Sequence, residues 1–178
     1  MKHLIVLKPL LLSLIISFSI ISLYGQKLTG RVIGTLNSFD YYNNICSQTV
    51  NNSNNAFDGD INTYFAGCDR NNAWVGLDLE EPHIITEIAY CPREDMQDRL
   101  MLGVFEGSNN PDFGDAIPIF VITQNPENKK LTKQVLHSSR AFRYVRYIGP
   151  NNTRGNIAEV EFYGFKSAGN NSKLFQTT

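Results

Sequence analysis

Residues 157–164 read IAEVEFYG, and apolar and acidic side chains alternate along this stretch. Successive side chains of a β-strand point to opposite faces, so the alanine, valine and phenylalanine share one face while Glu159 and Glu161 share the other. This alternation is typical of a strand that buries its apolar face against a core. A glutamate on the opposite face is ordinarily solvated.

The rest of the chain repeats this β pattern. From residue 27 onward no stretch of a dozen residues has apolar positions at helical spacing, whereas short segments rich in Val, Ile, Phe and Tyr recur between turn residues. The predicted strands are residues 28–36, 74–79, 84–90, 102–108, 117–122, 131–137, 142–149 and 157–164. Eight such segments favour an all-β fold, a jelly-roll β-sandwich.

The two ends of the chain differ in composition from the segment between them. Residues 1–25 carry two lysines and then an apolar run, which is typical of a secretory signal peptide cleaved near Gly25. An uncleaved membrane anchor is the alternative, although the run is shorter than the ~20 apolar residues of a usual membrane span. We expect one domain over residues 27–165 and a disordered tail or linker over residues 166–178.

The charge balance argues against two classes of partner. Removing residues 1–25 takes away two of the 16 Lys and Arg and none of the 17 Asp and Glu, which leaves 14 basic residues and a net charge of −3. An acidic domain gives no support to nucleic-acid binding or to attraction toward anionic membranes. The basic and aromatic run RAFRYVRY, residues 140–147, is explained by the alternation of a strand.

A short acidic loop, AFDGDINTYF at residues 56–65, suggests a cation site. Calcium takes six to eight oxygen ligands, and the first three oxygen positions of an EF-hand loop are filled by Asp58, Asp60 and Asn62. The EF-hand reading fails, because Thr63 and Asp69 stand where the turn glycine and the closing glutamate belong. An ordinary Asp-Gly turn with solvated acids is the alternative.

A cation held by this loop needs ligands from elsewhere in the chain. Glu159, at the start of the last predicted strand, is a candidate for the missing carboxylate. The competing interpretation is a solvated glutamate on an exposed face.

Five segments, taken together, resemble a known family. They are NAFDGDINTYF (55–65), AWVGLDLEEPHIITEIAYCPRED (73–95), FEGSNNPDF (105–113), FRYVRYIGP (142–150) and NIAEVEFYG (156–164). Their order and spacing resemble a discoidin-like domain of the coagulation factor 5/8 type C superfamily. Within it the chain is most similar to the galactose-binding-like carbohydrate-binding modules of secreted bacterial proteins. The resemblance covers about residues 28–164 and implies a galactose-binding domain-like jelly roll.

The resemblance implies one structural calcium between the acidic loop and the last strand. Carried over by position, its ligands are the carbonyls of Asn55, Asp60, Thr63 and Ala158, the Thr63 hydroxyl, and the carboxylates of Asp58 and Glu159. The number of these oxygens lies within the range that calcium usually coordinates, and the two carboxylates balance the charge of the ion. A site filled by protein leaves no open position for activating water, so the implied role is structural.

The family places its sugar site at the loop end near the calcium, here residues 41–44, 65–72, 92–99 and 150–156. Candidate ligand-binding residues on these loops are Tyr42, Phe65, Arg93, Gln97, Asp98 and Asn152. Planar polar groups meet sugar hydroxyls, and aromatic rings lie against the apolar face of the sugar. Tyr41 is a further stacking candidate, whereas Trp74 begins an apolar strand and is expected in the core.

Two departures weaken any assignment to galactose. Ala66 stands where galactose-binding members often carry a histidine, and residues 94–99, EDMQDR, lack the asparagine that tends to follow the arginine. For Arg93 itself the alternative is an ion pair with Glu94, Asp95 or Asp98 that braces the loop.

Three cysteines, at positions 46, 68 and 91, predict one disulfide and one leftover thiol in an oxidising compartment. The sequence leaves three pairings open. We favour Cys68 with Cys91, because both border loops that are expected to lie close together. Their spacing matches no zinc site.

These features predict a secreted, non-catalytic carbohydrate-binding or glycan-adhesion module, with a glycan or glycoconjugate as its partner. A discoidin-type lipid- or protein-binding adhesion domain is the alternative; lipid binding predicts apolar loop tips and a basic surround, whereas these loops are rich in asparagine. Catalysis is disfavoured, because after residue 25 the histidines are His83 and His137 alone and no serine or cysteine has an evident base. The oligomeric state stays open.

Overall fold

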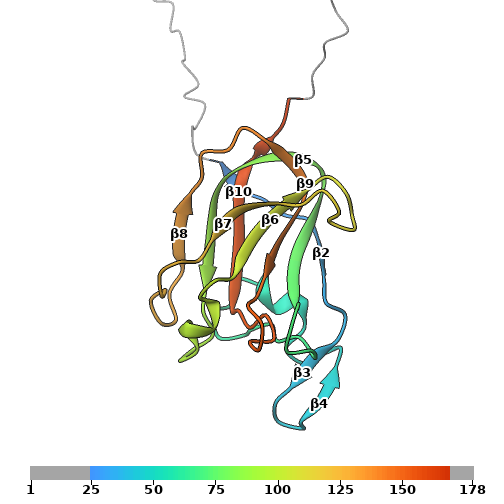
Figure 1. The fold of residues 1–178 in the computed structure, drawn as a ribbon, viewed down its shortest axis with the longest axis vertical. Coiled ribbons are helices and arrows are strands. Elements are labelled where there is room, and N and C mark those ends of the chain that lie inside the picture. The colour runs from blue at the N-terminus through green and yellow to red at the C-terminus, as the bar shows by residue number, and fades with distance from the viewer. Residues whose placement is uncertain (1–24, 169–178) are drawn as a thin grey trace, which may run out of the picture.

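The strands form an antiparallel sheet that folds back on itself into two layers, because β5 (Trp74–Cys91) runs through both of them. The computed structural model describes residues 25–168 (Figure 1). The predicted signal peptide, apart from Gly25, and most of the predicted tail lie outside the described residues. Within the described part, no helix is long and apolar enough to cross a membrane.

The first layer is built on the first half of β5. This half lies between β2 (Arg31–Gly34) and β9 (Ala141–Ile148), with Leu77 opposite Val32 on one side and opposite Val145 on the other. The layer continues from β9 through β6 (Val104–Ser108) to β7 (Ile117–Val121).

The second layer is built on the second half of β5. That half pairs with β10 (Glu159–Lys166) and with β8 (Thr132–Val135), and β1 (Gln26–Lys27) extends β10. A separate hairpin of β3 (Ser38–Asp40) and β4 (Ile45–Ser47) projects from one end of the body (Figure 1). Two short 3-10 turns, η1 (Ser53–Ala56) and η2 (Gln97–Leu100), complete the elements.

The predicted all-β sandwich is confirmed. Each of the eight predicted strands overlaps an observed one, but residues 74–79 and 84–90 belong to the single strand β5. The sequence analysis missed β1, β3 and β4, because each has only two or three residues and little apolar alternation.

Aromatic side chains from both layers fill the core. The ring of Phe105 lies 5.2 Å from that of Tyr147, 5.6 Å from that of Tyr90 and 6.1 Å from that of Phe162, measured between centroids. Phe162 comes from the alternating stretch that predicted β10, and its side chain is buried as expected. The mutual packing of these rings fixes the spacing of the two layers.

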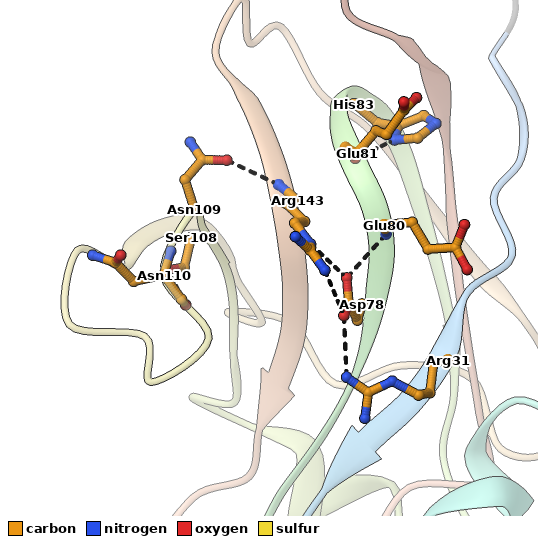
Figure 2. A network of polar contacts seen from close by, with 9 residues as sticks. All are labelled: Arg31, Asp78, Glu80, Glu81, His83, Ser108, Asn109, Asn110 and Arg143. Atoms are coloured by element: carbon orange, nitrogen blue, oxygen red, sulfur yellow. Dashed lines mark hydrogen bonds and ion pairs between the residues drawn. The ribbon is translucent and has the colours of Figure 1, made fainter.

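A buried carboxylate stabilises the bend where β5 passes between the layers. Figure 2 shows Asp78 between Arg31 of β2 and Arg143 of β9. Arg143 donates from Nε to Asp78 Oδ1 at 2.9 Å, and Arg31 donates from Nη2 to Oδ2 at 3.1 Å. The backbone N–H of Glu80, a residue with a positive φ of 67°, donates to Asp78 Oδ1 at 2.9 Å. Chiefly through Arg143, these contacts lower the pKa of Asp78 to about 2.

The predicted Cys68–Cys91 disulfide is wrong. Cys68 pairs with Cys46 of β4, and Cys91 is a buried free thiol at the end of β5. The prediction failed because it placed Cys91 on a loop, whereas β5 continues through this residue and packs it in the interior. Burial raises the pKa of the Cys91 thiol to about 11, which makes it unreactive at neutral pH.

We expect the Asp78 ion pairs to give the protein a specific loss of stability in acid. A carboxyl whose pKa is lower in the folded than in the unfolded chain stabilises the fold above its unfolded pKa, here 3.8, and loses that stabilisation as the pH falls toward about 2. Asp78→Asn should therefore lower the unfolding free energy at pH 7 by about 2 kcal/mol and flatten its dependence on pH between 5 and 2. Urea unfolding at several pH values, with the exposed Asp69→Asn as the matched control, tests this. Equal behaviour of the two variants would contradict it.

Candidate functional site

In the acidic loop, three oxygen acceptors converge on one hydroxyl group. The Thr63 hydroxyl lies 2.7 Å from Asp58 Oδ2, 3.1 Å from the Asp60 carbonyl and 3.2 Å from the Asn55 carbonyl. A threonine hydroxyl donates one hydrogen, so it satisfies one of these three acceptors at a time. The loop therefore presents a convergent set of acceptors that suits a cation.

Glu159 joins this loop across a separation of 100 residues. Its Oε2 accepts a hydrogen bond from the backbone N–H of Gly59 at 3.1 Å. Its side chain is 1% exposed, and its Oε1 has no hydrogen-bond partner among the described residues. Lys27 Nζ is 3.9 Å from Oε1, an ion pair too long for a hydrogen bond. The interpretation of Glu159 as a solvated surface residue is thus wrong.

Burial makes this carboxyl difficult to ionise. Desolvation raises the pKa of Glu159 to about 7, and the nearby charge of Asp58 adds to the effect, while the Gly59 hydrogen bond and Lys27 oppose it. A buried carboxylate with an unpaired oxygen is costly unless a cation or a proton neutralises it.

Asp60 turns its side chain away from the cluster. Its Oδ1 accepts from the backbone N–H of Asn62 at 2.9 Å and from Asn62 Nδ2 at 2.7 Å, and these bonds lower the pKa of Asp60. The Asp60 carbonyl, rather than its carboxylate, is the oxygen near the Thr63 hydroxyl. This orientation matches the carbonyl role that the family resemblance implies for Asp60.

The donor set fits a hard, oxygen-preferring cation. Within residues 25–168 no three His, Cys, Asp or Glu side chains are grouped as a metal cluster. A cation here would depend on the carboxylates of Asp58 and Glu159 together with neutral carbonyl and hydroxyl oxygens, as calcium commonly does. Ala158 is buried directly before Glu159, at the start of β10.

A hollow of about 290 Å³ lies beside this oxygen cluster and shares Thr63 with it. Its lining residues are Ile61, Asn62, Thr63, Tyr64, Arg93, Glu94 and Asp95. The hollow thus combines an aromatic ring with amide, carboxylate and guanidinium groups.

Arg93 stacks on aromatic rings rather than bracing its loop. Its guanidinium carbon lies 3.9 Å from the ring centroid of Tyr64 and 4.9 Å from that of Tyr41. In the described part of the chain it makes no ion pair within 4.0 Å; the neighbouring Glu94 pairs with Lys129 at 3.3 Å instead. The alternative interpretation of Arg93, an ion pair with Glu94, Asp95 or Asp98, is therefore not observed in the described part of the chain.

This stack extends into a longer aromatic row, which we define as Arg154, Phe39, Tyr41, Arg93 and Tyr64. The Arg154 guanidinium lies 3.7 Å from the Phe39 ring centroid, and the Phe39 and Tyr41 rings are 4.9 Å apart. Tyr41 and Tyr64 are 6.4 Å apart. The aromatic row brings together three of the four loops that the sequence analysis assigned to the sugar site, residues 41–44, 92–99 and 150–156.

Phe65 does not belong to the accessible surface, contrary to its prediction as a stacking residue. Its side chain is fully buried, and its backbone forms a bridge with Ile157 through hydrogen bonds of 2.8 and 3.3 Å. Neighbouring side chains of an extended segment point to opposite sides, so Tyr64 faces the hollow while Phe65 enters the core. The sequence analysis missed Tyr64, because a turn precedes it and the sequence does not show which of the two aromatic neighbours faces the hollow.

The other predicted ligand residues lie outside the lining of the hollow. Tyr42, Asp98 and Asn152 are exposed, and the backbone N–H of Asn152 donates to Asn71 Oδ1 at 2.9 Å. Gln97 is half-buried, and its Oε1 lacks a hydrogen-bond partner within residues 25–168. Trp74, predicted in the core, is partly buried and packs edge-on against Phe113 at 5.3 Å.

The sequence analysis also missed Arg154. Its Nη1 donates to the Gly67 carbonyl at 3.2 Å and to the Cys68 carbonyl, while its guanidinium covers Phe39. Arg154 adopts a positive φ of 62°, which a bulky residue rarely does without compensating contacts. No signal in the linear sequence separates this arginine from others on loops.

The chain matches one domain-family model and is similar to several solved structures. The model of the F5/8 type C domain matches residues 41–162. The fold is similar to the solved CBM62 module of Xyl5A from Clostridium thermocellum, with 44% identity and a TM-score of 0.73; the match covers 79% of this chain and 98% of that module. No curated protein matches the chain.

Two more distant structures share the fold. A fucolectin from the serum of striped bass, Morone saxatilis, is 23% identical with a TM-score of 0.62, over 77% of this chain and 47% of that one. The CpGH89CBM32-6 module produced by Clostridium perfringens is 22% identical with a TM-score of 0.53, over 75% of this chain and 92% of that one. With most of the domain matched by the family model, the chain belongs to the F5/8 type C domain family.

Proposed function

We propose that this protein is a secreted, non-catalytic carbohydrate-binding module whose sugar-binding loops are stabilised by a structural calcium. The observation that carries the proposal is the stacking of Arg93 on Tyr64 and Tyr41 at a polar hollow that shares Thr63 with the oxygen cluster. The similarity to the CBM62 module, which extends over nearly all of that module, supports a carbohydrate ligand and an extracellular setting.

The hollow has the chemistry that sugar recognition requires. A guanidinium that stacks through its face keeps its N–H groups at the edge, where they donate to hydroxyl oxygens. Asn62 and Asp95, which also line the hollow, offer an amide and a carboxylate, although the Asp95 carboxylate also accepts from Asn128 at 2.8 Å. The phenol ring of Tyr64 supplies the aromatic surface for the apolar face of a sugar ring. Galactose specificity is not part of the proposal, since the usual histidine is replaced by the fully buried Ala66.

For the calcium, the proposed ligands are the carbonyls of Asn55, Asp60, Thr63 and Ala158, the Thr63 hydroxyl, and the carboxylates of Asp58 and Glu159. Bound there, the ion would supply positive charge to the buried Glu159 carboxylate and would join the acidic loop to β10. The unpaired Oε1 of Glu159 supports this assignment. Closing a loop of this length is entropically costly without such a cross-link.

We expect Arg93→Ala to abolish most glycan binding. Hydrogen bonds from a charged group contribute about 1.5–3 kcal/mol each, so the loss of Arg93 should weaken binding roughly 10- to 100-fold. Glycan-array screening followed by titration calorimetry measures this, with the exposed Arg140→Ala as the control for loss of a surface arginine. Unchanged binding by the Arg93 variant would contradict the assigned site.

Calcium should raise the melting temperature, and Glu159→Gln should remove that increase. A ligand that binds only the folded state adds about 2.7 kcal/mol at 100 times its Kd, which corresponds to several degrees for a domain of this size. Differential scanning calorimetry with calcium and with chelator tests this. Exposed Glu127→Gln is the control and should retain the full increase. Equal melting of the wild-type protein in both buffers would rule out the calcium.

Calcium affinity should also depend on pH through Glu159. In the calcium-free protein the pKa of this carboxyl is about 7, so below that pH a proton competes with the cation. The affinity for calcium should fall roughly tenfold between pH 8 and pH 6, because the ionised fraction of the Glu159 carboxyl falls by about that factor. Calorimetric titration of calcium at several pH values measures the slope. A flat profile over this range would indicate that Glu159 is not a ligand.

A further inference from the structure

The sandwich is open on the side where β7 and β8 lie. β7 ends the strand order of the first layer and β8 pairs with β5 alone, so within residues 25–168 these two edges do not pair with each other. A cleft of about 360 Å³ occupies the opening, lined by both strands, by the second half of β5 and by the loop that connects β7 to β8 (Figure 1). This cleft shares no lining residue with the hollow or with the four loops assigned to the sugar site.

β8 turns polar side chains toward the interior, where a strand of a sandwich ordinarily places apolar ones. Thr132 lies opposite Tyr90 and Gln134 lies opposite Ile88 in the pairing of β8 with β5. Opposite residues of adjacent strands share a face, and Tyr90 and Ile88 belong to the core, so Thr132 and Gln134 also face inward. Both are partly buried, whereas the alternate residues of β8 are exposed. The inner face of β8 is therefore suited to a polar occupant.

Tyr90 brings an unpartnered hydroxyl to the cleft. The residue is 4% exposed, and its ring lies 5.6 Å from that of Phe105 and 6.2 Å from that of Phe120, between centroids. Burial alone raises the pKa of the phenol, with no hydrogen bond from the described residues contributing. Buried hydroxyls in proteins are usually satisfied by a protein group, a water molecule or a ligand. Because Tyr90 lines the cleft, the occupant of the cleft supplies that partner.

The loop that forms the outer wall of the cleft is fixed near both ends. Ile122 is fully buried, and its backbone N–H donates to the Gly103 carbonyl at 3.0 Å. At the other end, Asn128 Oδ1 accepts from the backbone N–H of Asp95 at 2.9 Å, and Asn128 Nδ2 donates to Asp95 Oδ1 at 2.8 Å. The wall is thus pre-organised, which lowers the entropic cost of binding against it.

The lining of the cleft favours a neutral, hydroxyl-rich ligand. It carries the amides of Gln124, Asn125 and Gln134 beside threonine hydroxyls and two aromatic rings. The charged group of the lining, Glu127, pairs with Lys130 at 2.8 Å, so the cleft offers no free cation to an anionic ligand. Amides donate and accept hydrogen bonds as sugar hydroxyls do, and aromatic rings lie against the apolar face of a sugar.

We propose that this cleft is a second carbohydrate site, separate from the hollow, that takes a neutral mono- or disaccharide. Its volume lies within the range of small-molecule sites, roughly 300–1,000 Å³. Gln134 Nε2 donates one hydrogen to the Val135 carbonyl at 3.0 Å, which leaves its Oε1 and second amide hydrogen for the sugar. The cleft has no charged donor comparable to Arg93, so it is the weaker of the two sites. The ligand class follows from the lining of the cleft and does not rest on the proposed function.

The test isolates the cleft by using the full chain with Arg93→Ala. Calorimetry measures the binding of a panel of neutral mono- and disaccharides, with glucuronic acid as the anionic probe. Tyr90→Phe and Gln134→Ala are each added to the Arg93→Ala chain. Tyr147→Phe is the matched control, because the Tyr147 ring lies 5.2 Å from that of Phe105 and carries an unpartnered hydroxyl, but does not line the cleft.

Arg93→Ala should retain weak binding of a neutral saccharide. Tyr90→Phe and Gln134→Ala should each lower that affinity about 3- to 10-fold, the usual effect of one neutral hydrogen bond, whereas Tyr147→Phe should change it less than twofold. Equal affinities of the two tyrosine variants would overturn the cleft as a sugar site.

The outcomes separate the cleft from the hollow. Loss of all saccharide binding in Arg93→Ala would overturn the cleft and still support the hollow. Full binding in Arg93→Ala, reduced by Tyr90→Phe, would assign the sugar to the cleft and contradict the hollow. A wild type that binds no saccharide would refute both sites. Binding of glucuronic acid but of no neutral saccharide by Arg93→Ala would overturn the proposed ligand class.

Discussion

The contact between the acidic loop and the start of β10 joins the two distant parts of the chain on which the proposed calcium site depends. The Gly59 N–H donates to Glu159 Oε2 at 3.1 Å, while Glu159 Oε1 is buried without a hydrogen-bond partner in the described region. An ionised carboxylate in that position repels Asp58 and loses its hydration, which explains why its pKa is raised to about 7. The proposed cation would neutralise both carboxylates and would thereby convert an unfavourable burial into a cross-link between two distant parts of the chain.

The proposed binding surface would depend on that proposed cross-link, because the same loop contributes to both. Thr63 belongs to the oxygen cluster and to the hollow, and the next residue, Tyr64, stacks with Arg93. From there the aromatic row leads to the β3–β4 hairpin, which a disulfide and Arg154 hold against the body. Asp78 secures the opposite end of the domain, where β5 bends between the layers, so that the loops are carried on a rigid sandwich.

Alternation made β10 predictable, since its buried positions Val160, Phe162 and Gly164 lie two residues apart with the less buried Glu161 and Tyr163 between them. The first half of β5 is instead buried without alternation from Val75 to Leu79, and its apolar and β-branched composition indicated the strand. The union of two predicted strands into β5 was not predictable, because its continuity depends on Asp78 meeting Arg31 and Arg143 from other strands. The proximity of Asp58 and Glu159 was proposed from family resemblance, whereas their separation along the chain gives no local signal. The disulfide was mispredicted for a similar reason: the position of Cys91 depends on how far β5 extends. Phe65 and Tyr64 show that the identity of an aromatic residue does not reveal which of two neighbours faces the solvent.

The most direct test of the cation is its stoichiometry in the purified protein. The protein is equilibrated with excess calcium, passed over a desalting column and analysed for metal by inductively coupled plasma mass spectrometry. We expect one calcium per chain in the wild-type protein and none in a variant that combines Asp58→Asn with Glu159→Gln. A wild-type protein that retains no more calcium than this variant would contradict the proposed link between the acidic loop and β10.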